Sequence, residues 1–248
     1  MDQAFIQFEH VKKAFDEKVI YKDLSLGIQK GETITIIGGS GTGKSVMLKL
    51  LLALMKPDDG QIFFDGKDVV EMGEEELNHT RKRVGMLFQG GALFDSMTVY
   101  ENVAYPIYEN YKDYDEAKIA KIVQEKLDVV GLGDTAQMMP SDLSGGMKKR
   151  IALARAIATD PEVILYDEPT TGLDPTNTNR INELIIDLQK RFKVTSIVVT
   201  HDMSSAFKVS DRLALLYDRK IEWVGTKDEV DHSDNEIVKK FIEGQIGE

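Results

Sequence analysis

One glycine-rich stretch has the spacing of a phosphate-binding loop: Gly38-Gly39-Ser40-Gly41-Thr42-Gly43-Lys44-Ser45. Glycines let the backbone approach a ligand without a collision with a Cβ atom, and the N–H groups of such a loop point at phosphates. Lys44 is then expected to reach the terminal phosphates of a nucleotide, and the Ser45 hydroxyl to bind Mg²⁺. The alternative is a turn that only connects a strand to a helix. We predict a nucleoside triphosphate site, because Lys44 and Ser45 follow the glycines directly.

A pair of carboxylates follows the apolar run Val163 to Tyr166. Asp167, at the end of this predicted strand, is expected to hold Mg²⁺ together with Ser45. Glu168 comes next, and a carboxylate at that position is a candidate base that polarises water for attack on the γ-phosphate. An acidic pair on the surface is the alternative, and the phosphate loop upstream argues against it. We therefore predict hydrolysis of the nucleotide as well as binding.

Two more polar residues come at the ends of predicted strands. Gln89 follows the strand Val84 to Phe88, and His201 follows Ile197 to Thr200. The carboxyl ends of parallel strands share one edge of a sheet, where ligands bind. Gln89 is therefore a candidate contact of Mg²⁺ or of the attacking water, and His201 of the γ-phosphate. A purely structural role is the alternative for both.

A second anion-binding feature is indicated at the start of another predicted helix, residues 145 to 158. Ser144 is a good N-cap for this helix, and Gly145 and Gly146 leave its first backbone N–H groups bare. On these residues alone, the stretch is either a phosphate contact or only a capped helix. Three basic residues follow in its first turns: Lys148, Lys149 and Arg150. We interpret them as a solvated basic face, and contact with a bound polyanion is the alternative.

The elements that must position these residues follow from the hydrophobic pattern. Short runs rich in β-branched residues alternate with helical segments, and this alternation predicts an α/β fold with a parallel sheet. A smaller antiparallel layer is indicated by alternating apolar residues near the N-terminus and by the turn at Asp65-Gly66. The predicted strands and helices of the core are Thr33 to Ile37, Val46 to Leu54, Val163 to Tyr166, Asn179 to Phe192 and Ser196 to Val199, followed by a hairpin from Leu213 to Val224 and a helix from Asn235 to Glu243.

The middle of the chain has helical character from about Thr98 to Thr159. A block of helices inserted into an α/β chain predicts a subdomain with its own mobility. We expect one domain over residues 1–248. Within it, residues 1–90 and 160–248 form a nucleotide-binding core with the antiparallel β-subdomain, and about 91–159 form the helical subdomain.

The composition limits the classes of partner. The net charge of -11 disfavours nucleic acid as the main partner. The absence of cysteine excludes disulfides and fits a reducing cytosol. We expect no signal segment, no apolar stretch of the ~20 residues that cross a membrane, and no long C-terminal tail for partner contacts. A role in a membrane process would therefore be exercised from the water side, through a partner.

Taken together, the motifs resemble those of ABC ATPases. The stretch Leu143-Ser144-Gly145-Gly146-Met147 resembles the LSGGQ signature of that family, with Met147 in place of Gln. The resemblance implies a P-loop NTPase fold with a RecA-like core, ATP and Mg²⁺ as cofactors, and hydrolysis of ATP to ADP and phosphate. It covers nearly the whole chain, in the order phosphate loop, Gln89, signature, Asp167-Glu168, Gly172-Leu173-Asp174-Pro175 and His201.

The same resemblance implies a site shared between two copies. In ABC ATPases, two chains pair head to tail, with ATP between the phosphate loop of one and the signature of the other. Ser144, Gly145 and Gly146 would then contact the γ-phosphate across the homodimer, and Asp174 would lie in the D-loop that links the two sites. Phe15 matches the aromatic residue that stacks on adenine, and a role for Phe15 in the core is the alternative.

A finer resemblance concerns the transported substrate. Residues 90–106 and Met147 are similar to the ATPases of Mla/Mce-type lipid transporters. This implies an ATPase that powers phospholipid transport and maintains lipid asymmetry, peripheral to the cytoplasmic face of the inner membrane. It also implies a permease that docks near residues 90–106 and an Mce-type lipid-binding protein in the complex. The alternatives are the ATPase of an amino-acid or other small-solute ABC importer, and a soluble ABC protein that acts on ribosomes or DNA.

Overall fold

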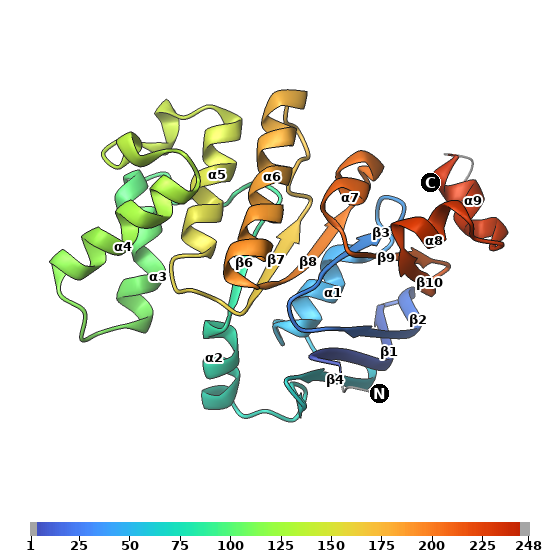
Figure 1. Ribbon diagram of the computed structural model, residues 1–248. Helices are drawn as coiled ribbons and strands as arrows, with labels where there is room; N and C mark the ends of the chain where they lie inside the picture. Colours follow the sequence, from blue (N-terminus) through green and yellow to red (C-terminus); the bar gives the residue numbers. More distant parts are fainter. Residues whose placement is uncertain (1–3, 244–248) are drawn as a thin grey trace.

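Two β-sheets with helices around them make up the computed structural model, which describes residues 4–243 (Figure 1). The larger sheet has the strand order β10-β9-β3-β8-β7-β6, and its neighbours are parallel except for the β9–β10 hairpin. The predicted parallel sheet and terminal hairpin are thus confirmed. Its strands are β3 (Thr33–Ile37), β6 (Val84–Leu87), β7 (Val163–Asp167), β8 (Thr195–Thr200), β9 (Arg212–Tyr217) and β10 (Lys220–Thr226).

The smaller sheet is antiparallel throughout, as the alternating pattern near the N-terminus predicts. Its order is β2-β1-β4-β5. The turn between β4 and β5 has positive φ at Asp65 (53°) and Gly66 (79°), which suits a tight two-residue hairpin. The strands are β1 (Ile6–Phe15), β2 (Lys18–Ile28), β4 (Asp59–Phe64) and β5 (Lys67–Asp68).

Helices cover both faces of the larger sheet. Every residue of β3, β7 and β8 is buried, as expected for parallel strands between two layers. Helix α1 (Lys44–Leu51) packs between the two sheets, while α6 (Pro175–Phe192) and α7 (Met203–Val209) lie on the other face (Figure 1). The remaining helices of the core are α2 (Glu74–Lys82), α8 (Lys227–Asp231) and α9 (Glu236–Ile242).

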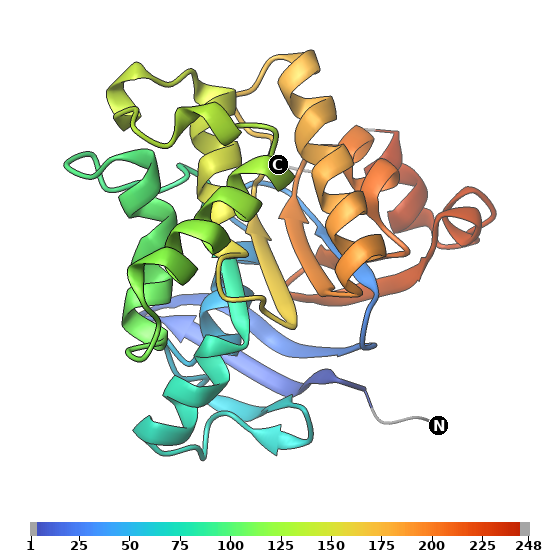
Figure 2. The same ribbon diagram turned by 60° about the vertical axis from the view of Figure 1, so that its left-hand side comes forward.

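Three helices stand side by side at one end of the molecule, in green to yellow in Figure 2. They are α3 (Val99–Asn110), α4 (Glu116–Val129) and α5 (Gly145–Ala156), with 3₁₀ turns at Gly133–Thr135 and Pro140–Asp142. They share one apolar cluster, which includes Val103, Val123 and Ile151 and continues to Ile164 of β7 and Ile185 of α6.

Several predicted boundaries are wrong. The first helix was expected to extend to Leu54, but it ends at Leu51, since Ala53 has a φ of 49° and Leu54 is 59% exposed. Helix α6 begins at Pro175, four residues before the predicted start, because Asp174 caps it. The strand β6 ends one residue before Phe88. Helices α2, α7 and α8 had no prediction; α2 buries only Thr80 and so has no apolar stripe.

Along residues 4–243, no helix combines the length and the apolar character needed to cross a membrane. The expectations about a signal segment and a C-terminal tail fall partly on residues 1–3 and 244–248, outside the described residues.

Candidate nucleotide site

The phosphate loop connects β3 to α1 in a conformation that requires glycine. Gly41 and Gly43 have φ values of 73° and 107°, where residues with a side chain are strained. A Cβ atom on Gly43 would lie 2.5 Å from Cγ2 of Ile20, and one on Gly38 would lie 2.7 Å from the Leu216 carbonyl oxygen. The loop therefore presents its backbone closely against two neighbouring strands at the N-terminus of a helix.

Lys44, the first residue of α1, is buried within this loop and is only 6% exposed. Its ammonium donates to the carbonyl oxygens of Gly38 and Gly39, both at 2.9 Å, and lies 3.8 Å from Oε1 of Glu168. Burial lowers the pKa of Lys44, and the negative charges of Glu168 and Asp167 act in the opposite direction. Because neutral carbonyls are its close partners, phosphate oxygens would be stronger acceptors for this cation.

Ser45 and Asp167 meet at the carboxyl end of β7. The Ser45 hydroxyl donates to Oδ1 of Asp167 at 2.6 Å, so one small cation can contact both oxygens. Mg²⁺ prefers such hard oxygen donors and is often held by one or two protein groups together with substrate phosphates. No group of three or more His, Cys, Asp or Glu side chains that could hold a metal alone occurs among residues 4–243. This donor set fits a Mg²⁺ ion that is shared with a nucleotide.

Glu168 is buried and held in a fixed orientation. Its φ is 48°, an unfavourable value for a residue with a side chain, and such strain is common at functional sites. The carboxylate accepts hydrogen bonds from the hydroxyls of Thr171 (3.1 Å) and Thr200 (3.2 Å). Nδ1 of His201 lies 2.9 Å from Oε2 of the same carboxylate. Neighbours from two segments, the loop after β7 and the end of β8, thus orient one candidate base.

A cleft of about 390 Å³ brings together eight of the predicted residues, from the phosphate loop and from the ends of three strands. Gln89, Glu168 and His201 reach it from the carboxyl ends of β6, β7 and β8, as the parallel topology predicts. Lys18 and Ile20 of β2 were not predicted. They reach the cleft because the N-terminal hairpin packs against the phosphate loop, and no sequence pattern around them indicates this contact. The lining residues are Lys18, Ile20, Ser40, Gly41, Gly43, Lys44, Ser45, Val46, Gln89, Glu168 and His201.

Phe15 lies at the end of β1 and does not line the cleft itself. It pairs in register with Lys18, which does, and its side chain is 42% exposed. The Lys13 ammonium lies 5.3 Å from the centre of its ring. The alternative of a core role for Phe15 is therefore wrong.

The signature residues lie outside the cleft. Ser144 caps α5 by accepting a hydrogen bond from the Met147 N–H at 3.3 Å, and both Ser144 and Gly145 are exposed. Gly146 is buried against α6, since a Cβ atom there would lie 2.3 Å from Oδ1 of Asn177. The phosphate loop and the signature of one chain therefore do not form a single site.

Asp174 is the N-cap of α6. Its carboxylate accepts from the N–H groups of Thr176 (2.9 Å) and Asn177 (3.1 Å). Hydrogen bonding, first from the Asn177 side chain and then from its backbone N–H, lowers the pKa of Asp174. Asp174 and the signature glycine Gly146 thus contact the same residue, Asn177.

Comparison with known proteins agrees with this geometry. A family model described as "ABC transporter" matches residues 21–171, a range that includes the phosphate loop, the signature and the acidic pair. The chain belongs to the ABC transporter family. The resemblance of its motifs to this family is thereby confirmed.

Relatives align with almost the whole chain of this ABC transporter protein. An intermembrane phospholipid transport system ATP-binding protein, MlaF of Haemophilus influenzae, is 42% identical over 99% of this chain and 92% of its own. A probable ribonucleotide transport ATP-binding protein, mkl of Mycobacterium leprae, is 41% identical over 97% of this chain and 69% of its own. The chloroplastic protein TRIGALACTOSYLDIACYLGLYCEROL 3 of Arabidopsis thaliana is 42% identical over 98% of this chain and 74% of its own.

Solved ABC structures have the same fold. CbiO1 from Clostridium perfringens, part of the ABC transporter complex cbiONQ, superposes with a TM-score of 0.85 at 28% identity, over 97% of this chain and 96% of its own. The ATP-binding cassette MJ0796, as a dimer in a post-hydrolysis state bound to ADP and Pi, superposes with a TM-score of 0.81 at 32% identity. The match covers 89% of this chain and 98% of its own. The predicted P-loop fold of ABC ATPases is confirmed.

Proposed function

We propose that this protein binds and hydrolyses ATP as the nucleotide-binding subunit of an ABC transporter for phospholipids, of the Mla/Mce type. The observation that carries the catalytic part is the setting of Glu168, a buried carboxylate aligned by two hydroxyls and an imidazole, with Lys44 3.8 Å away. Such a group can polarise the water that attacks the γ-phosphate. The products are ADP and phosphate.

The side chains of the cleft have separate tasks in this reaction. Lys44 exchanges the loop carbonyls for the terminal phosphates, and the N–H groups of the loop and of the start of α1 bind the remaining charge. His201 contacts Glu168 through Nδ1, which leaves Nε2 for the γ-phosphate. Phe15, exposed beside Lys18, stacks on the adenine ring.

Ser45, Asp167 and Gln89 are the proposed contacts of Mg²⁺. When bound, the ion would withdraw charge from the phosphate oxygens. Ser45 and Asp167 already share a hydrogen bond, so their oxygens need little rearrangement to hold a cation. Gln89, which lines the same cleft, would contact the ion or orient the attacking water.

Two copies of the chain would complete each site. Ser144 and Gly145 are exposed at the N-terminus of α5, where they can contact the nucleotide of a second copy, together with the backbone of Gly146. Asp174 would lie near the boundary between the two sites. The dimeric state of the related cassette MJ0796 supports this arrangement. Residues 91–159 would move as a subdomain against the core when the dimer closes.

A groove next to residues 90–106 is the proposed docking site of the membrane permease. Phe88, Phe94 and Tyr105 are each 41% exposed there, and the rings of Phe94 and Tyr105 lie 5.0 Å apart. A cluster of exposed aromatic side chains beside a groove of about 440 Å³ is typical of a protein interface. Movement of the helices on dimer closure would reach the permease through this surface.

Replacing Phe94 and Tyr105 together by alanine should detach the ATPase from the permease. We expect at least tenfold less permease in a co-purification, because the loss of about 1.4 kcal/mol from an interface already lowers affinity tenfold. The ATPase rate of the isolated variant should stay within about twofold of wild type. Phe192→Ala, which removes another exposed aromatic residue, should leave the co-purification unchanged. Equal loss of the permease in both variants would contradict the proposed surface.

The names of the relatives differ in substrate, since one is called a phospholipid transport protein and another a ribonucleotide transport protein. We favour phospholipid because the MlaF relative aligns over 92% of its own length, and because residues 90–106 and Met147 resemble that group. The complex would then include an Mce-type lipid-binding protein and lie at the inner membrane, with this subunit on the cytoplasmic face.

Isolation of the complex from native membranes in mild detergent, with mass spectrometry of proteins and lipids, tests this assignment. An Mce-type protein with bound phospholipid is the expected result. A small-solute binding protein, or bound amino acid or ribonucleotide, would support the importer alternative instead. Salt-sensitive binding of the purified chain to RNA or DNA would favour a soluble ABC protein, a role that the net charge of -11 disfavours.

A further inference from the structure

Lys149 is a buried lysine beside the signature that has no task in the mechanism above. It lies in the second turn of α5 and is only 6% exposed. Its ammonium donates to two backbone carbonyl oxygens, that of Gln89 and, at 3.2 Å, that of Glu168. Among the ion pairs of the described residues, none involves Lys149. Burial of a charged group without an ion pair costs stability, so the position of this ammonium needs an explanation.

The two acceptors belong to the two segments that carry the hydrolytic groups. Gln89 lies in the turn after β6, and Glu168 directly follows β7 with its φ of 48°. The Glu168 carbonyl also accepts from the N–H of Thr171 at 3.3 Å. Lys149 therefore helps to hold the peptide of Glu168, while Thr171, Thr200 and His201 hold its carboxylate. Displacement of the ammonium would remove one of the hydrogen bonds that hold the peptide of Glu168 in place.

Lys149 also stands close to the signature on the same rigid helix. Ser144 caps α5, and Lys149 follows five residues later, about 7.5 Å along the helix axis. A shift of the N-terminus of α5 must therefore carry the Lys149 ammonium with it. In the proposed dimer, Ser144 contacts the nucleotide of the partner, whereas Lys149 contacts the hydrolytic segments of its own chain.

We propose that Lys149 is a positioning residue, which couples the engagement of Ser144 with the partner's ATP to the placement of Gln89 and Glu168 in its own site. This inference rests on the proposed ATPase function. It assigns to the signature helix a second task besides phosphate contact, namely communication between the two sites of the dimer.

The decisive variant is Lys149→Met, which keeps an unbranched side chain, one atom shorter, and removes the ammonium. We expect kcat to fall roughly 10²-fold, the loss that a misplacement of about 1 Å can cause. The KM for ATP and the affinity of the single chain for ATP should stay within about threefold, because no contact with the nucleotide is removed. Lys149→Arg keeps a cationic donor and should retain most of the rate.

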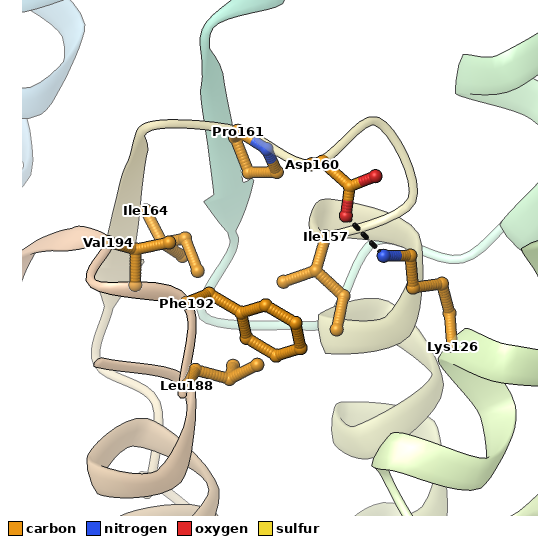
Figure 3. A pocket seen from close by; sticks show the side chains of 8 residues that line it. All are labelled: Lys126, Ile157, Asp160, Pro161, Ile164, Leu188, Phe192 and Val194. Atoms are coloured by element: carbon orange, nitrogen blue, oxygen red, sulfur yellow. Dashed lines mark hydrogen bonds and ion pairs between the residues drawn. The ribbon is translucent and has the colours of Figure 1, made fainter. Parts of the chain in front are cut away.

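Lys126 offers a matched control, since it is the other buried lysine of the three-helix unit. It is 7% exposed and forms an ion pair with Asp160 at the edge of an apolar pocket lined by Phe192 and Ile157 (Figure 3). Lys126→Met should lower the melting temperature and leave kcat within about twofold. Hydrogen exchange should rise near residues 89 and 168 in Lys149→Met only, because only this variant frees those carbonyls.

The outcomes separate the two proposals. A wild-type kcat in Lys149→Met, or an equal loss of kcat in Lys126→Met, would overturn the positioning role while ATP hydrolysis by the wild type stands. A loss of ATP affinity equal to the loss of kcat would also overturn it. If the wild-type protein, alone or with its permease, does not hydrolyse ATP, the proposed function itself fails.

Discussion

Replacement of Glu168 by glutamine is expected to lower ATP turnover by about 10²–10⁴-fold, the usual contribution of a general base. Glutamine has nearly the same shape, so the hydrogen bonds from Thr171 and Thr200 can persist at an amide oxygen. The amide cannot take a proton from water. ATP binding should therefore remain, and the closed dimer should accumulate because it is no longer opened by hydrolysis. Phosphate release and light scattering with ATP measure the two effects.

Glu162→Gln is the matched control for this experiment. Glu162 precedes β7 and Glu168 follows it, so the two residues flank one strand at opposite ends. The Arg83 guanidinium beside Glu162, at 2.6 Å, holds the pKa of that carboxyl at about 2. The ion pair should therefore contribute stability at neutral pH that is lost as the pH falls from about 4.5 toward 2. The control variant should have a lower melting temperature at pH 7 and hydrolyse ATP at the wild-type rate.

Wild-type turnover by Glu168→Gln would show that another group is the base.

The second large effect is expected from Ser144→Arg. Ser144 is exposed at the N-terminus of α5, and an arginine there would obstruct contact with the nucleotide of a second copy. Groups supplied in trans in related phosphoryl transfers contribute about 10³–10⁵ in rate, so we expect hydrolysis to fall at least 10³-fold. The single chain should still bind ATP with normal affinity, since Ser144 does not line its own cleft. A fluorescent ATP analogue measures this binding.

Ser144→Arg also removes a helix cap, which costs about 1 kcal/mol of stability. Thr226→Arg removes the corresponding cap of α8, where the Thr226 hydroxyl accepts from the Glu229 N–H at 3.4 Å. This control should lose similar stability and keep its hydrolysis rate. If Ser144→Arg lost ATP binding as a single chain, the site would not be shared as proposed.

Sequence patterns predict the parts of this site that are local. The phosphate loop depends on consecutive residues between a strand and a helix, and its glycines are needed where φ is positive. The positions of Gln89 and His201 followed from the rule that parallel strands end at one edge of a sheet, and both residues line the cleft. These predictions succeed because the periodicity of strands and helices is present in the sequence itself and needs no knowledge of tertiary contacts.

Several contacts that orient the site are not local, and no pattern indicates them. Thr200 meets Glu168 only because β7 and β8 are neighbours in the sheet, whereas Thr171 is three residues away along the chain. The start of α6 was missed because its first residues are polar, and only the cap at Asp174 and the proline at Pro175 mark it. Lys149 reaches Gln89 across 60 residues of sequence, and its basic character suggested a solvated face rather than a buried position.

The central claim is that ATP binds between the phosphate loop of one copy and the signature of another. The chain has no cysteine, so single cysteines can be introduced without background. One preparation carries Ser40→Cys and the other Ser144→Cys, both with Glu168→Gln, and they are mixed with a short bifunctional maleimide. The prediction is a covalent heterodimer that forms with ATP and Mg²⁺ and is absent with ADP. Cross-linking that does not depend on ATP, or that joins the Ser40→Cys chains to each other instead, would contradict the claim.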